Sequence, residues 1–563
     1  MVMKKILTAI FLLMLPLVSL PGQERIRERV YISTDREVYV AGDAVWMSAW
    51  CLDASSGELS SFSKTAYVEV HSATGLVQTG KISLDKGRGA GRLTLPTTLP
   101  TGPYRLFAYT RLGASEEGFD PLPGARTFSV FNTFSADRVP GGVEVVEELP
   151  LASAPVSAGA LQLSVADAAS SSKARIVLSN PGKEAVSFSL SVHHDDGIPA
   201  PESARITDFV REVHALPSAR GFDTSVVPDY EGEIIRARVA GTDEEGVKAV
   251  VDKYAVMSSP GSGENLYTDY IKEDGIVSFY TSNIYGDQEM FLEIENLDRG
   301  SVCHLELVSP FLDLPAGSFK PMPLHPDWAS ALKLRGLGMQ LEKNFDADTL
   351  YTALPARTHL VLDEQECRQY NLDDYTRFQL MEEVFVEYIP EVRVRSVGGK
   401  KEIQVWTSNP LGGFTFQNGK TLALLDGVPV LDHEKILSYD PNLVKRIDIY
   451  THGYFFGTRI FEGVLNFVTF KGTLPSMEFA DNVRIVDFQG CSIPLAYTCE
   501  GVGSDYPDYR QTLYWHPMLT LAPGERVEVE CKTPAYGGRF EVVAEGLTTG
   551  NDPVRAVAAF EVK

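Results

Sequence analysis

The sequence has 563 residues, a length that fits about four domains. Hydrophobic residues make up 44% and charged residues 22%, so the chain is able to bury cores and is not a disordered polymer, a collagen or a coiled-coil rod. The 75 acidic residues exceed the 51 basic residues and give a net charge of −24, which disfavours binding to the phosphates of nucleic acids.

Residues 1–23 have the layout of a secretory signal peptide. Lys4 and Lys5 form a positive start, residues 6–20 are an apolar run, and Gly22 suits a cleavage site. The run is about 15 residues long, shorter than the roughly 20 that cross a bilayer. We therefore expect an exported chain whose mature form has no transmembrane helix and is soluble or peripheral to a membrane.

Export to an oxidising compartment allows cysteines to pair. The chain has six, too few for a fold built on disulfides. Cys491 and Cys499 are close enough in sequence to close a small loop, and Cys531 is a competing partner. The other three fall in separate expected units and are interpreted as buried single thiols: Cys51, Cys303 and Cys367.

Residues 25–133 alternate apolar and polar side chains at every second position. Runs around Val45, Val68, Leu93 and Leu106 show this period, and turns rich in Gly, Asp, Ser and Pro separate them. Short alternating strands at regular spacing predict a β-sandwich.

The start of this sandwich carries a recognisable pattern. A threonine–aspartate pair is followed by an aromatic residue, a glycine–aspartate turn and an apolar strand: Thr34, Asp35, Tyr39, Gly42, Asp43 and Val45. A later strand begins at Gly102-Pro103-Tyr104. The pattern resembles the MG2 domain of alpha-2-macroglobulin-type proteins. This resemblance implies a fold and not a function.

The next four segments are less regular. Residues 134–157 have no clear period and are interpreted as a linker. Residues 158–230 form a second β-rich unit, with a turn at Asn180-Pro181-Gly182. Residues 231–310 contain strands separated by acidic and glycine turns and resemble small carboxypeptidase-regulatory-like or macroglobulin-like sandwiches. Residues 311–362 are expected to connect domains.

The pattern changes in residues 363–473, which predict an α+β unit. Apolar residues recur every three or four positions between Asp373 and Pro390, as in a helix. A buried strand at residues 422–425 then meets the structural turn Asp426-Gly427, where glycine is expected to have positive φ.

The motifs of this unit follow a specific order. They are Asp426-Gly427-Val428-Pro429, Asp440-Pro441, then Val444, Ile447 and Ile449, Gly457-Thr458-Arg459, Gly463-Val464-Leu465-Asn466-Phe467 and Thr469. The order resembles the plug domain of TonB-dependent outer-membrane receptors, especially those of Bacteroidetes. In such receptors a barrel of about 22 strands follows, at about 10 residues each. Only 91 residues follow Gly472, so transport is not expected.

Residues 474–563 alternate again and predict a closing immunoglobulin-like sandwich, with Trp515 as a candidate core residue. The predicted fold class is therefore mainly β: tandem immunoglobulin/macroglobulin-like β-sandwiches and one α+β, plug-like unit. The combination resembles a group of large exported Bacteroidetes proteins.

No set of residues points to catalysis or metal binding. The densest cluster, His193-His194-Asp195-Asp196, has metal-ligand chemistry, but neighbouring histidines on a strand point to opposite faces. Gly261-Ser262-Gly263 reads as a turn and not as a nucleophile elbow. We therefore expect no catalytic residues, no metal and no cofactor.

One loop is a candidate for binding a partner. Tyr454, Phe455 and Phe456 lie between Gly453 and Gly457. Exposed aromatics would anchor an interface, because buried aromatic residues dominate interface energetics. The alternative is that they pack back onto the sheet of their own unit.

The order of modules favours a non-catalytic protein of a Gram-negative cell envelope. In this hypothesis the sandwiches are spacers, and the plug-like unit docks a protein partner in the periplasm or at the outer membrane. One alternative is a macroglobulin-like protease inhibitor that proteases cut within residues 134–157. Its inhibition would be non-covalent, because Gln489-Gly490-Cys491-Ser492 does not match the macroglobulin thioester motif. Another is an exported protein that binds or acts on glycans.

Overall fold

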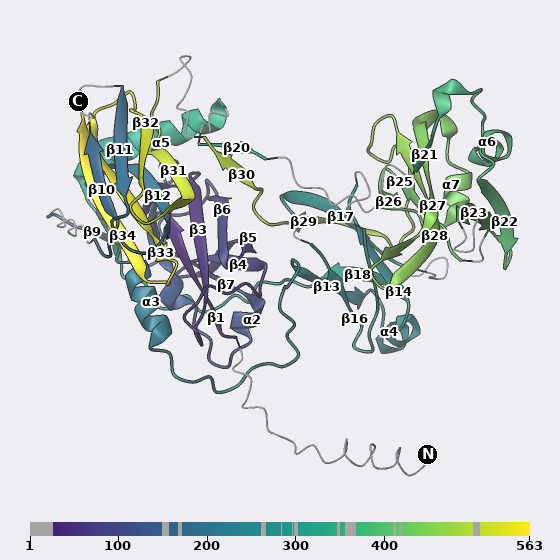
Figure 1. The fold of residues 1–563 in the computed structure, drawn as a ribbon, viewed down its shortest axis with the longest axis horizontal. Coiled ribbons are helices and arrows are strands. Elements are labelled where there is room, and N and C mark those ends of the chain that lie inside the picture. Colours follow the sequence, from purple (N-terminus) through teal and green to yellow (C-terminus); the bar gives the residue numbers. More distant parts are fainter. Residues whose placement is uncertain are drawn as a thin grey trace, which may run out of the picture.

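Strands dominate the structure, and this confirms the mainly β class. The computed structural model describes residues 26–148, 157–166, 172–260, 266–282, 284–295, 297, 302–345, 350–354, 367–408, 413–416, 419–498 and 507–563. Figure 1 shows two lobes, one with the purple and yellow strands and one with most of the teal and green elements. The expected signal peptide lies outside the described residues. No helix within the described ranges is both long and apolar enough to cross a membrane.

The N-terminal sandwich is a sheet of eight strands folded onto itself, in the order β1-β3-β6-β5-β4-β7-β8-β2. Val68 and Val70 enter its core from β4. The outer face of β4 is buried as well, because residues 311–319 pack on the cluster around Tyr67. Its elements are β1 (Glu28–Thr34), β2 (Val38–Val40), β3 (Ala44–Asp53), β4 (Thr65–Ser72), β5 (Gly75–Asp85), β6 (Arg88–Thr94), β7 (Gly102–Tyr109), α2 (Arg111–Ala114) and β8 (Arg126–Phe131).

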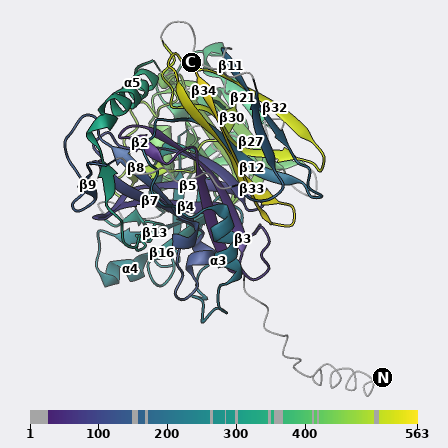
Figure 2. The same ribbon diagram turned by 90° about the vertical axis from the view of Figure 1, so that its left-hand side faces the viewer.

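The second sandwich draws its strands from two distant parts of the chain, and we call it the composite sandwich. One sheet has the order β10-β11-β32 and the other β31-β12-β33-β34. Figure 2 shows the yellow C-terminal strands beside the blue strands β11 and β12. Its elements are β10 (Gln162–Ala166), β11 (Lys173–Ser179), β12 (Val186–Asp195), β31 (Thr512–Leu521), β32 (Arg526–Lys532), β33 (Gly538–Thr548) and β34 (Pro553–Val562).

The composite sandwich differs from the domain boundaries expected from the sequence. Residues 158–230 and 474–563 were expected to form separate units, whereas β12 lies between β31 and β33 in one sheet. Each segment alone has too few strands to cover an apolar sheet face, so the two segments complete one core. Trp515 is fully buried, but it packs against Trp46 between the two sandwiches and not inside the core.

The middle unit is a smaller sandwich with sheets β16-β13-β18 and β15-β14-β17-β29. Its last strand comes from residues far along the chain, since β29 pairs with β17. Its elements are β13 (Ile234–Ala240), α4 (Glu244–Val250), β14 (Tyr254–Ser258), β15 (Leu266–Tyr270), β16 (Ile276–Tyr280), β17 (Asp287–Ile294), β18 (His304–Leu307) and β29 (Arg484–Gln489).

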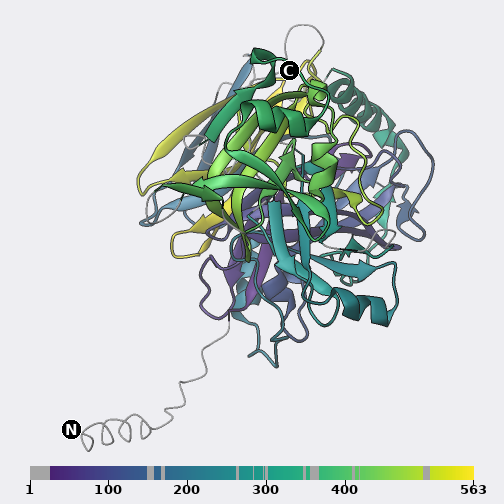
Figure 3. The same ribbon diagram turned by 90° about the vertical axis from the view of Figure 1, so that its right-hand side faces the viewer.

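The α+β unit is a mixed five-stranded sheet, β21-β27-β28-β25-β26, with β25 parallel to β28. Figure 3 shows this green unit in front of the teal middle unit. Its elements are β21 (Cys367–Asn371), α6 (Met381–Tyr388), β22 (Val392–Val397), β23 (Lys400–Ser408), β24 (Phe414–Phe416), β25 (Leu422–Leu425), β26 (Val428–Pro429), α7 (His433–Leu437), β27 (Val444–Phe456) and β28 (Arg459–Thr469).

Both faces of the five-stranded sheet are covered. On one face, side chains of α6, α7, β22 and β23 pack on Ile447, Leu465 and Phe467. On the other face, Leu424 and Phe461 pack on Val256 and Leu266 of the middle unit in a shared apolar cluster. The sheet is therefore a layer between its own helices and the middle unit.

The segments expected to be linkers are partly structured. In the expected linker 134–157, β9 (Val143–Val145) runs parallel to β19 (Met322–Leu324). The remaining elements are α3 (Ile206–His214), α5 (Ala329–Asn344), β20 (Tyr351–Ala353) and β30 (Leu495–Tyr497). Ile206, Phe209, Val210 and Val213 recur at helical spacing in α3 and are buried against Tyr31 and Trp50.

Polar contacts join the two lobes at β5. The Nζ of Lys81 lies 2.7 and 2.8 Å from the carboxylate oxygens of Glu233 and 2.7 Å from the backbone oxygen of Gln489. Three acceptors use all three N–H donors of a lysine. The ammonium group therefore ties the N-terminal sandwich to the middle unit from two sides.

Candidate functional site

The three aromatics of the candidate loop lie at the end of the β27–β28 hairpin and do not point the same way. Phe456 is buried, with 2% of its surface exposed, and Tyr454 packs beside it against the middle unit. Phe455 lies between them in sequence and is 72% exposed. Successive side chains of a strand point to opposite faces, so the two alternatives drawn from the sequence each describe part of this loop.

The exposed aromatic has an exposed apolar neighbour. Phe455 is the cross-strand partner of Ile460, which is 51% exposed. The other side of the hairpin turn packs closely against Thr268 of β15. Gly457 in this turn has φ +59°, and a Cβ added to it would lie 2.2 Å from the backbone oxygen of Thr268. One face of the hairpin end is thus anchored on β15, and the other presents an apolar pair to solvent.

Exposed apolar residues gather on the α+β unit. Of the 23 large hydrophobic side chains exposed among the described residues, eight belong to this unit: Tyr375, Leu380, Val386, Val397, Phe414, Phe455, Ile460 and Phe470. Soluble proteins expose single apolar residues routinely, but Phe455 and Ile460 are neighbours across two strands.

The turn Asp426-Gly427 has a structural role. Asp426 (φ 47°) and Gly427 (φ 84°) are the two central residues of the β25–β26 hairpin, where a tight turn needs positive φ at both. The Asp426 carboxylate accepts hydrogen bonds from the backbone N–H and the hydroxyl of Thr469, both at 2.7 Å, and from the N–H of Leu474 at 2.9 Å. These three hydrogen bonds join the turn to the end of β28 and to the segment that follows it, so they stabilise the fold of the unit.

The proposed pairing of Cys491 with Cys499 stays a prediction, because Cys499 lies outside the described residues. Cys491 is buried beside the Lys81–Glu233 pair. Burial raises the pKa of its thiol to about 12. Gly261-Ser262-Gly263 also lies outside the described residues.

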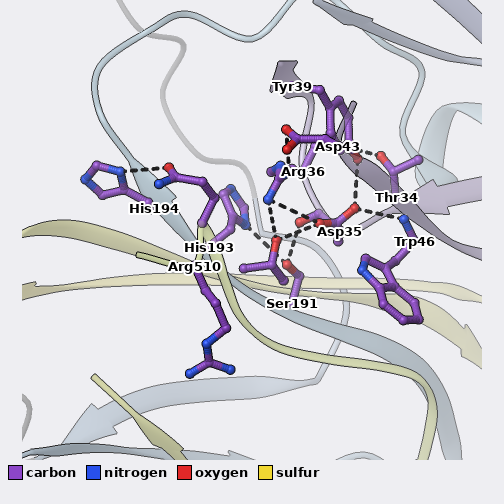
Figure 4. A network of polar contacts seen from close by, with 12 residues as sticks. Thr34, Asp35, Arg36, Tyr39, Asp43, Trp46, Ser191, His193, His194 and Arg510 are labelled. Atoms are coloured by element: carbon purple, nitrogen blue, oxygen red, sulfur yellow. Dashed lines mark hydrogen bonds and ion pairs between the residues drawn. The ribbon is translucent and has the colours of Figure 1, made fainter. Parts of the chain in front are cut away.

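The cluster His193-His194-Asp195-Asp196 sits where the two sandwiches meet, and its two histidines face different partners (Figure 4). The Nδ1 of His194 contacts Oε1 of Gln511 at 3.2 Å, on the side of the composite core. His193 points the other way, with Nδ1 3.2 Å from the hydroxyl of Ser191. Burial and the Arg36 and Arg335 guanidiniums lower the pKa of His193 to about 3, so its imidazole is neutral at pH 7.

Asp196 forms an ion pair with Arg335. Its oxygens accept hydrogen bonds from Nε and Nη2 of Arg335 at 2.6 and 2.9 Å, in the two-pronged geometry that guanidinium favours. Within the described part of the chain, no group of three or more His, Cys, Asp or Glu side chains is arranged to hold a metal ion.

Asp35, beside this cluster, links the two sandwiches through hydrogen bonds. Its carboxylate accepts from the hydroxyl of Tyr39 at 2.8 Å and from the hydroxyl of Thr512 at 2.6 Å. Arg36, next in sequence, pairs with Asp43 at 2.7 Å and donates to Thr512. The threonine–aspartate motif noted in the sequence therefore binds the C-terminal strands, and the sequence alone had no signal for that partner.

A cavity of about 200 Å³ lies between the middle unit and the α+β unit. His433 in its wall accepts from the N–H of Ile403 through Nδ1 and lies 3.1 Å from the oxygen of Thr421 through Nε2. These bonds fix the neutral form, and burial lowers the pKa of His433 to about 4. Burial, opposed by Lys435 and reinforced by Glu295 and Asp432, raises the pKa of Glu293 to about 7.

Because the pKa of Glu293 is raised, we expect Glu293→Gln to increase the stability of the fold by an amount that depends on pH. The neutral acid is favoured in the fold, so the wild type loses stability as pH rises from about 4.5 to about 7 and loses nothing further above that. We expect the substitution to stabilise the protein at pH 8 by up to about 3 kcal/mol and to have little effect at pH 4. Thermal melting at both pH values measures this, with the exposed Glu289→Gln as control; equal shifts at both would contradict it.

Comparisons with known proteins give limited information. No protein-family model matches the chain. No curated protein matches it either. Among solved structures, Escherichia coli alpha-2-macroglobulin activated by porcine elastase aligns at 10% identity and a TM-score of 0.24, covering 95% of this chain and 44% of that one. Salmonella alpha-2-macroglobulin reacted with methylamine aligns at 11% identity and a TM-score of 0.15, covering 95% and 29%.

An adhesin structure is also similar. The Escherichia coli adhesin FdeC aligns at 9% identity and a TM-score of 0.14, covering 47% of this chain and 58% of that one. The chain spans less than half the length of the macroglobulin structures that it matches. TM-scores this low support no argument about this chain.

Proposed function

We propose that the protein is a non-catalytic binding protein of the cell envelope, whose α+β unit docks a protein partner. The observation that carries the proposal is the exposed pair Phe455 and Ile460 on a hairpin whose opposite face is buried. A held hairpin presents its apolar pair without a large loss of conformational entropy on binding. The expected signal peptide and the plug-like motif order support an envelope location.

The exposed apolar pair defines the partner further. The partner would be a protein that offers an apolar pocket for Phe455 and Ile460. The N-terminal and composite sandwiches serve as spacers in this proposal.

The double substitution Phe455→Ser with Ile460→Ser is expected to remove docking. Central apolar side chains each contribute about 2 kcal/mol or more at an interface, so cross-links from the α+β unit to its partner should fall at least about tenfold. Cross-linking with mass spectrometry in native envelopes measures this.

Phe62→Ser is the matched control, because Phe62 is 51% exposed on the N-terminal sandwich. It should leave the cross-links unchanged. Cross-links that survive the double substitution, or that vanish equally in the control, would remove the hairpin from the interface.

A further inference from the structure

The ion pair between Lys81 of β5 and Glu233, the residue before β13, is shielded from solvent on both sides. The two side chains are only 2% and 6% exposed. In every other lysine–carboxylate pair between residues that the structure describes, the lysine is at least 45% exposed. Lysine and glutamate are almost never fully buried in folded proteins unless they are paired. The pair thus places an amine and a carboxyl group together in a site without bulk water.

The nitrogen of Lys81 lies directly against the carboxyl group of Glu233. Its Nζ is 2.8 Å from Oε1 and 2.7 Å from Oε2, which brings it within reach of the carbon that joins these oxygens. The last torsion of a glutamate is soft, so the carboxyl group is able to turn its face toward the nitrogen. Groups held about 3–3.5 Å apart in this way react with effective molarities of about 10⁵–10⁸ M.

The surroundings of the pair favour the neutral forms of both groups. The rings of Phe488 and Phe311 have their centroids 4.3 and 5.9 Å from Nζ. Burial raises the pKa of the Glu233 carboxyl, although Lys81 opposes this effect. When a proton passes from the ammonium group to the carboxylate, a neutral amine lies beside a neutral carboxylic acid.

The loss of both charges would leave no buried charge unpaired. The other charged groups that act on Glu233 are Asp229 and Arg111, and these two form their own ion pair at 3.5 Å. Their charges balance each other whether or not Lys81 and Glu233 are ionised. Removal of a complete buried ion pair also removes the desolvation cost of its two ions.

We propose that Lys81 and Glu233 condense into an isopeptide bond that joins the N-terminal sandwich covalently to the middle unit. The Nζ atom of the neutral amine forms a bond to Cδ of the carboxylic acid. The bond between Cδ and the hydroxyl oxygen breaks, and the hydroxyl group leaves as water with one proton from the nitrogen. The step changes no oxidation state and needs no further reactant.

The amide product fits the contacts around Nζ. An amide nitrogen keeps one N–H, and the backbone oxygen of Gln489, 2.7 Å from Nζ, is placed to accept it. The bond would connect residues that are 152 positions apart. A cross-link that closes so long a loop restricts the unfolded chain, and it would keep the two lobes attached even when their non-covalent contacts open.

Mass spectrometry of the full wild-type chain tests the proposal without any substitution. We expect the purified chain to be lighter than its sequence by one water molecule, with its first residue identified in a digest. The same digest should contain the peptides of Lys81 and Glu233 joined by an amide. The exposed pair of Lys320 and Glu202, with nitrogen and oxygen 2.6 Å apart, is the internal control and should stay unlinked.

Lys81→Arg keeps the positive charge but removes the amine, so this variant should have its full mass. It should also migrate more slowly than the wild type on a reducing, denaturing gel, because its loop is open. Lys320→Arg is the matched control and should keep the loss of water.

A wild-type chain of full mass would mean that the two residues form an ion pair only, and this overturns the proposal whether or not the variants fold. A loss of water that the digest places elsewhere also overturns it. One such place is Cys491, whose buried thiol feels the charges of Lys81 and Glu233. None of these outcomes depends on the docking of a protein partner.

Discussion

Replacing Glu545 with alanine is expected to lower the free energy of unfolding by about 3–5 kcal/mol at pH 7. The carboxylate is 1% exposed in β33. It accepts hydrogen bonds from the hydroxyl of Tyr31 at 2.9 Å, the N–H of Ile206 at 3.0 Å and Nη2 of Arg126 at 3.2 Å. Its removal leaves the buried Arg126 guanidinium with only the more distant Glu37 carboxylate, 3.6 Å away, and removing one partner is the costly way to break such a pair.

The loss depends on pH in a defined direction. Burial alone would raise the pKa of Glu545, but the Arg126 and Arg555 guanidiniums and the Ile206 N–H hold that pKa below its ordinary value. Such a carboxylate stabilises the fold above about pH 4.5, and this contribution fades as pH falls through the folded pKa. The variant should therefore differ from the wild type less at pH 3 than at pH 7.

Urea denaturation followed by tryptophan fluorescence measures the effect, since Trp46, Trp50 and Trp515 lie in or between the two sandwiches. Glu528→Ala is the control, because Glu528 makes only exposed ion pairs and should cost less than about 0.5 kcal/mol. A loss for Glu545→Ala as small as that of the control would show that its contacts do not join the sandwiches.

Replacing Glu295 with alanine is expected to loosen the α+β unit from the middle unit, again by about 3–5 kcal/mol. Glu295 is 5% exposed and forms ion pairs with Arg459 and Lys420 of the α+β unit. Although burial opposes them, these two cations hold the pKa of Glu295 below its usual value. Without it, the Arg459 guanidinium stays buried and has no other acid paired with it among the residues that the structure describes.

Hydrogen exchange locates the change. Protection should fall in β14, β15 and the β27–β28 hairpin, and should stay the same in the N-terminal sandwich. Glu306→Ala is the control, because its pair with Arg238 is exposed and belongs to the middle unit alone. Unchanged protection at the hairpin would mean that the apolar cluster around Leu424 and Phe461 suffices to hold the two units together.

The sequence predicted strands well where one local pattern decided the fold. Period-two alternation marked β3, β4, β6 and β7, because each has one face on a core. The turn at Asp426-Gly427 was also local, since two adjacent residues set its geometry. The helix of the α+β unit begins at Met381, later than expected from Asp373, because residues 372–374 form a separate 3₁₀ turn.

Long-range pairing had no such signal. Nothing in β11 or β12 indicates that their partners come from residues 512–548, because alternation shows a buried face and not the strand beside it. The same holds for a cavity of about 380 Å³ between the two sandwiches, whose wall combines Arg36, Arg126 and Arg335 from three distant segments. The exposed Phe455 and the buried Phe456 are distinguished only by the middle unit that covers one side of their strand.

The composite sandwich cannot form until its last strands have been synthesised. Lys173 and Glu530, paired across β11 and β32, are 357 positions apart, so the early strands leave the ribosome long before their partners exist. In that interval, β11 and β12 expose unpaired edges and an apolar face, which are sites of aggregation. We expect residues 173–195 to be open to aggregation until residues 512–548 pair with them, so truncations that remove those later strands would yield insoluble protein.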